Sequence, residues 1–578
     1  MNNQKELKNK SIYDVVICGG GLAGLTLARQ LKLAQPERSI AVIDRQTRPL
    51  PIATHKVGES TVELGAHYLG EKLQLTDYFE QQHFPKLGLR YFFGDATGPF
   101  HLRPEFGLSL FAPVESYQID RGVLENDLRQ MNEAAGITLI EGMSVKNICL
   151  ALDHSLHEIC FHDKARTQTQ SVRARWVVDA MGRRRYLQKK LDLSKGERSH
   201  YSAAWFRLSG RVDVNDLTPA AQQAWHDRVP NSKRYYSTNH LMGRGYWVWL
   251  IPLASGHTSV GIVTDERIHP FNRYHTYVKA MAWLRLYEPV LAEHIQADTP
   301  LDFRCMRRYS HSSKQVFSHH RWACVGEAGV FADPYYSPGT DRIGFANTIT
   351  TEMIRRDFRR TLTPQAVNHY NQFLIGLNDA LTRNIQAGYA SFGNETVTAA
   401  RLLWDFTAAW SLNCSKMFND TYLEPESYLQ LSKITAGFYA LTKRMQRLFA
   451  AWAAHPTKRL TYDFLDYLSL EFLDKLRRRN LQTGKTFAEL QADQEENMAR
   501  IEELAQVLFL LAVEDVMPER LAQFSEPLWL NAWRIDLDPA TWERGLFKPI
   551  TPARDLSDMR RAIRNKFQIR ESRGYSST

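Results

Sequence analysis

The chain has 578 residues, of which 44% are hydrophobic and 24% are charged, and its formal net charge is +10. This length exceeds what one hydrophobic core usually serves, so we expect one large composite fold or about two or three closely packed domains. No apolar run approaches the roughly 20 residues of a membrane-spanning helix, and the basic residues come without zinc-finger spacing, an RNA-recognition strand or a basic low-complexity arm, so neither a transmembrane segment nor nucleic-acid binding is expected.

The N-terminal segment and the cysteines indicate a cytoplasmic protein. The first residues, MNNQKELKNKSIYDVVICGG, are polar and basic and contain no apolar segment before the first predicted strand, so a signal peptide is not expected. The six cysteines are scattered without a CxxC pair or a His/Cys cluster. This spacing favours reduced thiols over disulfides or a zinc site, and we expect no metal.

The first recognisable unit is a strand, a glycine turn, a helix and a second strand. Residues 13–18, YDVVIC, predict a buried parallel strand, and the following GGGLAGLTLARQLK predicts a turn that opens an amphipathic helix. Gly19, Gly21 and Gly24 fit GxGxxG, a pattern that lets the backbone approach a pyrophosphate. The second strand, SIAVID, ends in Asp44, whose carboxylate could accept hydrogen bonds from ribose hydroxyls. The unit predicts dinucleotide binding but does not decide between FAD and a nicotinamide.

Three later segments decide between the two cofactors. SYQIDRGVLENDL places Arg121 before a helix, ARWVVDAMG runs a strand into Asp179, and RWACVGEAGVFADPYYSPG holds Gly326, Glu327 and Asp333. In this order the segments resemble the FAD-binding pattern of the para-hydroxybenzoate hydroxylase-like flavoprotein monooxygenases. The resemblance implies an α/β fold in which a Rossmann-type FAD-binding domain is interleaved with a β-sheet substrate domain. It also implies that Arg121, Gly326, Glu327 and Asp333 bind FAD.

Two further motifs narrow the resemblance. HFPKLGLRYFFG sets Lys86 in what we take to be an apolar strand, and GYWVWLIPLASG predicts an edge-like strand that carries Trp247 and Trp249. Taken alone, the lysine is best explained as a surface residue whose stem packs on the protein while its amine reaches water. The tryptophans are best explained as core residues. With the GxGxxG turn and the GES turn that contains Ser60, however, the set resembles the flavin-dependent halogenases over about residues 13–355.

The resemblance implies a reaction and its participants. Reduced FAD, supplied by a separate flavin reductase, would react with O₂ and with chloride or bromide to give hypohalous acid. Lys86 would be the catalytic residue that directs the halogen to an electron-rich ring, since a positioned amine can hold the oxidant. Ser60 would contact the cofactor, and Trp247 and Trp249 would wall the passage to the substrate. The substrate would be an aromatic small molecule or one bound to an acyl-carrier protein.

The sequence departs from that family at the motif DPYYSPG. Tyr336 occupies the position where tryptophan halogenases have a glutamate, and Pro338 has no N–H group to offer a halide. We therefore expect the halide at the backbone amides of Gly339 and Thr340, where a glycine turn opens a helix. These differences favour phenolic or carrier-bound substrates over free tryptophan and leave room for a loss of halogenation.

After about residue 355 the chain becomes helical, with apolar positions at helical spacing in TPQAVNHYNQFLIGLNDALTRN and GKTFAELQADQEENMARIEELAQVLFLL. We expect residues 1–355 to form the FAD-binding and substrate-sheet region and residues 356–578 to form a helical region that caps the substrate site. Basic helices leave peripheral membrane contact open. The sequence thus predicts an FAD-dependent halogenase of secondary-metabolite or pigment biosynthesis. The alternatives are a flavin monooxygenase that hydroxylates an aromatic or polyketide-type substrate and a non-catalytic flavoprotein scaffold.

Overall fold

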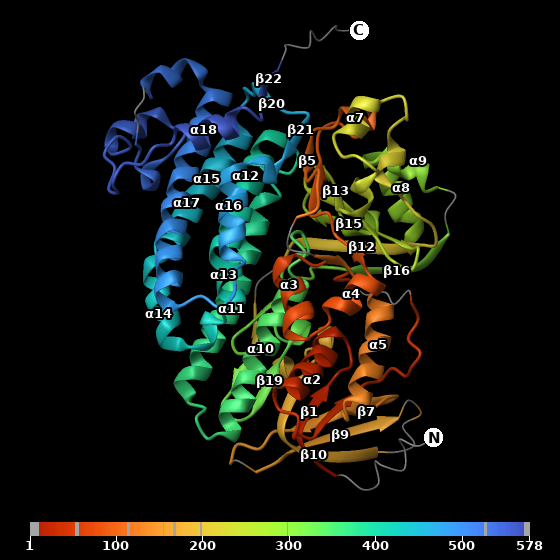
Figure 1. Cartoon of the computed structure of the whole chain (residues 1–578). Helices are drawn as coiled ribbons and strands as arrows, with labels where there is room; N and C mark the ends of the chain where they lie inside the picture. The colour runs from red at the N-terminus through yellow and green to blue at the C-terminus, as the bar shows by residue number, and fades with distance from the viewer. Residues whose placement is uncertain are drawn as a thin grey trace.

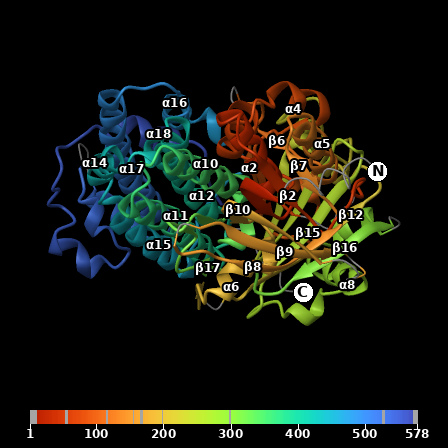
Figure 2. The same cartoon turned by 90° about the horizontal axis from the view of Figure 1, so that it is seen from below.

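Two eight-stranded mixed sheets and a large helical layer make up most of the part of the protein that the structure describes, and three two-stranded sheets accompany them (Figure 1). The computed structural model describes residues 11–52, 57–112, 116–153, 155–163, 165, 169–196, 199–296, 299–524 and 529–570. Figure 2, a view from below, shows the helical layer on one side of the molecule and the two sheets on the other. The fold class predicted from the sequence is confirmed.

The first sheet carries the predicted dinucleotide-binding unit. Its strands follow the order β18-β19-β10-β1-β2-β7, with β8 and β9 joined beside β10. Strand β1 pairs in parallel with both β2 and β10, and β10 pairs in parallel with β19. Because β1 is covered on both faces, its residues from Val15 to Cys18 are fully buried. The strands of this sheet are β1 (Ile12–Cys18), β2 (Ile40–Ile43), β7 (Thr138–Ile140), β8 (Met143–Cys149), β9 (His157–Asp163), β10 (Thr169–Asp179), β18 (Phe317–Ser318) and β19 (Trp322–Cys324).

The second sheet is mostly antiparallel and follows the order β16-β12-β15-β14-β13-β4-β5-β21. Strand β14, which holds the two tryptophans, lies between β13 and β15, so the prediction of an edge-like strand is wrong. Every residue of β14 is buried. Tyr246, Val248 and Leu250 pack in a cluster with α8 (Tyr277–Tyr287). Trp247, Trp249 and Ile251 pack on the other face, in the main core. The strands are β4 (Leu89–Phe92), β5 (Glu105–Gly107), β12 (Tyr201–Leu208), β13 (Thr238–Gly243), β14 (Tyr246–Pro252), β15 (Thr258–Asp265), β16 (Pro300–Met306) and β21 (Phe464–Asp466).

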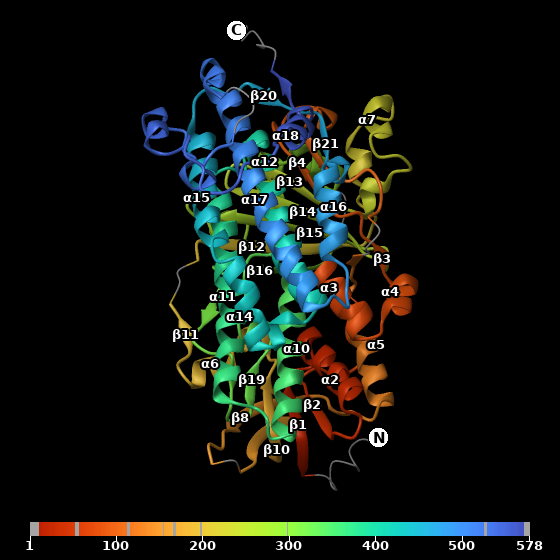
Figure 3. The ribbon, with the colours of Figure 1, turned by 60° about the vertical axis from the view of Figure 1, so that its left-hand side comes forward.

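Helices connect and cover the two sheets. Helix α10 packs against α2 and α3, and the long helix α17 runs across α12, α14 and α15 (Figure 3). Two helices contain π-helical turns, η1 (Tyr68–Lys72) after α3 and η8 (Ala409–Cys414) after α12. The principal helices are α2 (Leu22–Ala34), α3 (Glu63–His67), α4 (Thr76–Gln82), α5 (Arg121–Ala134), α8 (Tyr277–Tyr287), α10 (Gly339–Phe358), α11 (Pro364–Gly388), α12 (Glu395–Ala408), α13 (Ser415–Phe418), α14 (Pro425–Ile434), α15 (Phe438–Ala454), α16 (Glu471–Asn480), α17 (Phe487–Val516) and α18 (Ser557–Arg564).

The helical layer is also joined to the second sheet by a strand. Strand β21, which lies between α15 and α16 in the sequence, pairs in parallel with β5 and forms the last strand of that sheet. The backbone N–H of Glu105, at the start of β5, also donates a hydrogen bond of 2.9 Å to the carbonyl of Asp463. The chain after residue 355 therefore contributes to the architecture of the part before it.

Three absences hold for the described residues. None of their helices is both long enough and apolar enough to cross a membrane. No cluster of histidine, cysteine, aspartate and glutamate among them could hold a metal ion. The six cysteines are free thiols.

Candidate active site

The glycine turn between β1 and α2 is built for close packing on one side and for access on the other. Gly19 has φ of +115°, and a Cβ atom there would lie 2.4 Å from the carbonyl oxygen of Ala180. A Cβ on Gly24 would lie 1.9 Å from the carbonyl oxygen of Gly19, so both positions require glycine. A Cβ on Gly21 would meet nothing within 4 Å. Gly21 thus presents bare backbone to open space at the start of α2, which fits the approach of a pyrophosphate.

Asp44 holds this glycine turn in place. Its Oδ2 atom accepts a hydrogen bond from the backbone N–H of Gly20, and Oδ1 accepts one of 2.7 Å from Gln46. Arg129 donates a hydrogen bond of 2.7 Å from Nη2 to the Gly20 carbonyl and lies 3.5 Å from the Asp44 carboxylate. The carboxylate remains partly exposed just beyond β2. Its contact with ribose hydroxyls stays a prediction.

An inner cavity of about 110 Å³ lies where the two sheets meet the start of α10. The term inner cavity is used below for this space. It gathers nine of the thirteen residues that the sequence predicted for the cofactor, the halide and the passage wall, whereas Gly19, Gly21, Gly24 and Asp44 lie outside its lining. Those in its lining are Ser60, Arg121, Trp247, Trp249, Gly326, Glu327, Asp333, Gly339 and Thr340.

The charged residues of the inner cavity are held by neighbouring groups. Arg121 donates a hydrogen bond of 2.6 Å to the carbonyl of Val57 and pairs with Glu125 at 2.5 Å. Asp333 is buried and accepts hydrogen bonds from the hydroxyls of Tyr309 and Tyr389, at 2.6 and 2.9 Å. Burial raises the pKa of Asp333 to about 6, although both tyrosine hydrogen bonds oppose the shift. The cavity therefore offers a guanidinium and a carboxyl group in fixed positions.

The two tryptophans of β14 serve both as core and as wall. Trp247 and Trp249 are 1% and 4% exposed, and their rings lie 5.7 Å apart between centroids. Trp247 donates a hydrogen bond of 3.0 Å to the hydroxyl of Tyr389, and Trp249 donates one of 3.1 Å to Ser259. Both rings line the inner cavity, where they exclude water from its sheet side.

Lys86 lies in the loop between β3 (Phe84–Pro85) and β4, so the prediction that it sits in a strand is wrong. Its backbone N–H donates a hydrogen bond of 2.6 Å to the carbonyl of Ser116. The Nζ atom donates hydrogen bonds to Oγ of Ser60 at 2.8 Å and to the carbonyl oxygen of Thr61 at 2.6 Å. The side chain is 4% exposed, and burial lowers its pKa to about 7, against the opposing charges of Glu63 and Asp341. Near neutral pH a substantial fraction of the amine is unprotonated.

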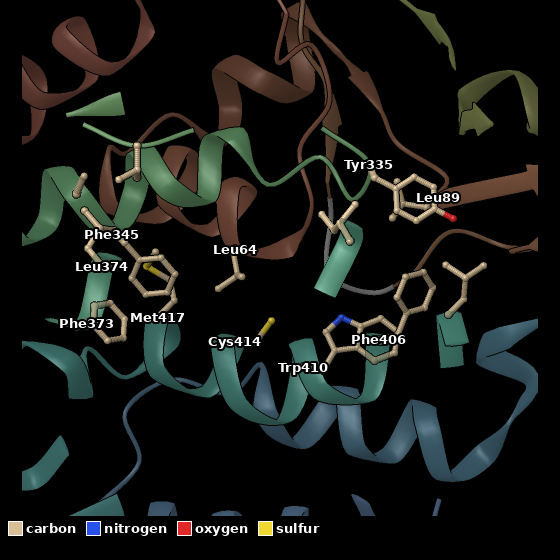
Figure 4. Packing of buried hydrophobic residues seen from close by; sticks show 14 of the residues in the cluster. Leu64, Leu89, Tyr335, Phe345, Phe373, Leu374, Phe406, Trp410, Cys414 and Met417 are labelled. Atoms are coloured by element: carbon tan, nitrogen blue, oxygen red, sulfur yellow. The ribbon is translucent and has the colours of Figure 1, made fainter. Parts of the chain in front are cut away.

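A second, outer cavity of about 880 Å³ begins at Lys86 and extends into the helical layer. Its wall combines Leu64 and Leu89 from the N-terminal half with Phe406, Trp410 and Cys414 from α12 and η8. Figure 4 shows Leu64 on one side of this space and Cys414 and Trp410 facing it from the other. A π-helical turn such as η8 often marks a functional site. Lys86 lines the outer cavity, while its hydrogen-bond partner Ser60 lines the inner one.

The residues around DPYYSPG are placed as follows. The Tyr336 hydroxyl donates a hydrogen bond of 2.6 Å to Oδ2 of Asp405, so the position expected to lack a carboxylate touches one from α12. Pro338 is the N-cap of α10 and lines both cavities. Gly339 and Thr340 form the first turn of α10; a Cβ on Gly339 would meet nothing within 4 Å, and Oγ1 of Thr340 has no hydrogen-bond partner among the described residues.

The sequence analysis missed two charged residues at this site, Asp341 and Arg342. Both are buried in the first turn of α10 and line the outer cavity, and Arg342 also lines the inner one. The signal in the sequence is a pair of adjacent charged residues directly after the predicted glycine turn. The signal could not be used without knowing that α10 packs on both α2 and α3.

The Rossmann-type unit, the antiparallel sheet and the cavity between them have the arrangement predicted for an FAD-binding protein that resembles the flavoprotein monooxygenases and halogenases. The open backbone at Gly21 and the fixed groups of the inner cavity fit that cofactor.

Comparison with known proteins shows that the chain is similar to halogenases in particular. A model of tryptophan halogenases matches residues 108–380, and a model of NAD(P)-binding Rossmann-like domains matches residues 17–81. A flavin-dependent halogenase of Dictyostelium discoideum is 28% identical over 371 residues, which cover 59% of this chain and 60% of that protein. A 1H-pyrrole-2-carbonyl-[peptidyl-carrier protein] chlorinase of Pseudomonas fluorescens is 25% identical over 379 residues, 62% of this chain and 79% of that protein.

Solved structures agree in fold. The crystal structure of the halogenase PltM matches 85% of this chain and 96% of its own, with a TM-score of 0.59 at 16% identity. The flavin-dependent brominase Bmp2 matches 66% of this chain and 89% of its own, with a TM-score of 0.53 at 18% identity. The predicted resemblance to the flavin-dependent halogenases is confirmed in sequence and in fold.

Proposed function

We propose that the protein is an FAD-dependent halogenase that uses reduced FAD, O₂ and chloride or bromide to halogenate an electron-rich aromatic substrate. The observation that carries the proposal is the position of Lys86. Its amine lines the outer cavity and is hydrogen-bonded to Ser60 of the inner cavity, so it stands between the two spaces. A surface lysine would be neither buried nor fixed by two hydrogen bonds.

Different side chains and backbone amides of the protein would then have separate roles in the reaction. Bound reduced FAD supplies, with O₂ and halide, the oxidised halogen as hypohalous acid. The amides of Gly339 and Thr340, at the positive end of α10, hold the halide, and Arg121 and Asp333 orient the cofactor. Trp247 and Trp249 keep water out of the inner cavity. Lys86, partly neutral near pH 7, holds the hypohalous acid by a hydrogen bond and directs it to one ring position.

The outer cavity suits a substrate larger than a single ring. Its volume of about 880 Å³ lies at the upper end of the range for small-molecule sites, and most of its wall is apolar. A phenolic compound with an apolar substituent or a ring tethered to a carrier protein would fit this space. Two relatives, from Pseudomonas fluorescens and Pseudoalteromonas luteoviolacea, are named for the halogenation of a pyrrole bound to a peptidyl-carrier protein. We include a carrier-bound substrate in the proposal for that reason.

The region after residue 355 would cap the substrate site. Residues of α11, α12, η8 and α15 complete the wall of the outer cavity, among them Leu381, Phe406, Trp410 and Phe438. We propose that residues 356–578 set substrate choice, while residues 1–355 hold the cofactor and the halide. A separate flavin reductase, a cytoplasmic location and a role in secondary-metabolite or pigment biosynthesis complete the proposal.

The test is a reconstituted reaction with bromide. The full-length protein is incubated with FAD, NADH, a flavin reductase and bromide, and with panels of phenols and of pyrrolyl and phenolic acyl-carrier proteins. We expect a product that is heavier by the mass of bromine minus hydrogen and shows the bromine isotope pair. A product heavier by one oxygen, formed without bromide, would instead identify a monooxygenase. Bound FAD with neither product across both panels would favour the scaffold.

A further inference from the structure

Three carboxyl groups in the described part of the chain reach the wall of the outer cavity, and they differ in their partners. Glu63 lies 3.3 Å from Nε of Arg477. Asp405 accepts hydrogen bonds from Tyr336 at 2.6 Å and from Asn384 at 2.8 Å. Asp341 accepts a hydrogen bond from the backbone N–H of Gly65, but its Oδ1 atom has no partner among the described residues, although the side chain is only 4% exposed.

Asp341 reaches the cavity because a glycine faces it. A Cβ atom added to Gly65 of α3 would lie 3.1 Å from Oδ1 of Asp341 and 2.9 Å from Cβ of Thr340. The missing side chain at Gly65 lets α3 and α10 approach and leaves room for the carboxyl group. Asp341 and Lys86 both line the outer cavity near its junction with the inner one, where Arg342 lines both spaces.

Asp341 and Lys86 also interact through their charges. The Asp341 carboxyl opposes the burial that lowers the pKa of Lys86 to about 7. Burial raises the pKa of Asp341 to about 7, and the charges of Arg342 and Lys86 oppose that shift while Glu63 adds to it. The charged and titratable groups that interact with the pair are Glu63 on α3 with its partner Arg477 on α16, Arg342 on α10, His240 on β13 and Cys414 of η8. Each of the two groups therefore favours the charged form of the other.

We propose that Asp341 is the catalytic carboxyl group that works with Lys86, in place of a glutamate at the position of Tyr336. Its catalytic role rests on the proposed halogenation, whereas its coupling to Lys86 does not. The carboxyl of Asp405 is a weaker candidate, because Tyr336 and Asn384 already occupy its oxygens. Glu63 is weaker too, because its charge is balanced by Arg477.

The proposed step balances as follows. Halogenation converts a ring C–H and hypohalous acid into a ring C–halogen bond and water. The ring supplies the electron pair of the new C–halogen bond, and the pair of the breaking halogen–oxygen bond stays on oxygen. Asp341 in its acid form donates a proton to that oxygen, which leaves as water. The carboxylate then takes the proton from the halogenated ring carbon as aromaticity returns, so the acid form is restored.

The coupling is tested on the protein without substrate. The pKa of Lys86 is measured in the full-length protein from the ¹³Cε shift of labelled lysine, assigned with Lys86→Arg. We expect Asp341→Asn to lower this pKa by about one unit, because a negative charge that favours the protonated amine is lost. Asp405→Asn is the matched control, since it removes another buried carboxyl of the same cavity wall and should leave Lys86 unchanged. An unchanged Lys86 pKa in Asp341→Asn, or an equal shift in both variants, would overturn the coupling.

The catalytic role is tested by turnover, with Asp341→Glu as a second variant in case Asp341→Asn does not fold. We expect Asp341→Asn to halogenate at least about 100-fold more slowly with FAD still bound, as for loss of a general acid–base group, and Asp341→Glu to recover part of that loss. A folded Asp341→Asn that halogenates at the normal rate would refute this role while leaving the proposed function intact. A normal Lys86–Asp341 coupling in a protein that halogenates nothing would instead refute the proposed function.

Discussion

Lys86 and Ser60 are joined by a hydrogen bond of 2.8 Å between Nζ and Oγ, and this bond crosses the wall between the two cavities. Oγ of Ser60 lies 2.7 Å from Oγ1 of Thr238 and 3.1 Å from Oγ of Ser337. The Lys86 amine is thus the last group in a series of neighbouring polar side chains that begins in the inner cavity. Its amine is held at a fixed place, as expected of a group that meets a reagent from one side and a substrate from the other.

The first prediction concerns Lys86 itself. Lys86→Ala should keep the fold and bound FAD but lose product halogenation by more than about 1000-fold, because a group needed in the transition state is removed. Lys475→Ala, which changes an exposed lysine paired with Glu471 on α16, is the control and should behave like the native protein. Flavin absorbance and product mass spectrometry measure the two properties separately. A flavin-loaded Lys86→Ala that still halogenates would contradict the mechanism.

The second prediction is a pH-dependent stability. The pKa of Lys86 falls from 10.5 to about 7 on burial, so between these values the unfolded chain binds a proton that the folded chain does not. Stability therefore rises with pH across this window, and the full cost is present below pH 7. Lys86→Met should be more stable than the native protein at pH 6 to 7, by on the order of 2 kcal/mol. Urea unfolding at several pH values measures this difference.

The gain from Lys86→Met should disappear towards pH 10.5. Above pH 10.5 the amine is neutral in both states, and the variant lacks the hydrogen bonds to Ser60 and Thr61. A stability difference that stays constant from pH 6 to pH 10 would show that the amine does not titrate in this window.

The third prediction separates two glycines of one turn. Gly21→Val should fold normally and lose FAD, because a Cβ atom there has no protein atom within 4 Å and a side chain would enter the space of the pyrophosphate. Gly19→Val should instead unfold the first sheet, since it combines a φ of +115° with a 2.4 Å contact to Ala180. Circular dichroism and flavin content together distinguish the two effects. Unchanged flavin content in Gly21→Val would reject the assignment of this turn.

The fourth prediction places the halide. Crystals soaked in bromide should show anomalous density at the backbone amides of Gly339 and Thr340, where α10 begins, and none at Pro338, which has no N–H group. The measurement needs neither substrate nor reductase. Bromide bound elsewhere in the inner cavity would exclude these amides as the halide site.

The sequence was most informative where a function depends on neighbouring residues. The glycine turn, Asp44 and the strand-to-helix turns at Arg121 and Gly326 were predictable because each forms within a few residues of its motif. The meeting of Arg121 and Gly326 in one cavity followed from a resemblance and not from local pattern. The position of β14 inside the sheet could not be predicted, because nothing within YWVWLIP shows which strands lie beside it.

Asp341 illustrates what local patterns cannot provide. An aspartate in the first turn of a helix is ordinarily exposed to solvent, where its negative charge is stabilised by the helix dipole. Only the packing of α3 against α10, made close by Gly65, buries this carboxyl group in the wall of the cavity that Lys86 also lines. The packing joins α3 and α10, which are far apart in the chain, so neither segment predicts it from its own sequence.

The pairing of β21 with β5 has a consequence for the order in which the protein assembles. During synthesis the second sheet stays incomplete, with β5 as its edge strand, until the ribosome has released α11 to α15 and then β21. Contacts so distant in sequence form slowly, and an unpaired strand edge is prone to associate with other chains. We therefore expect nascent or truncated chains that end before Phe464 to depend on chaperones, and a gene split at residue 355 to yield two insoluble halves.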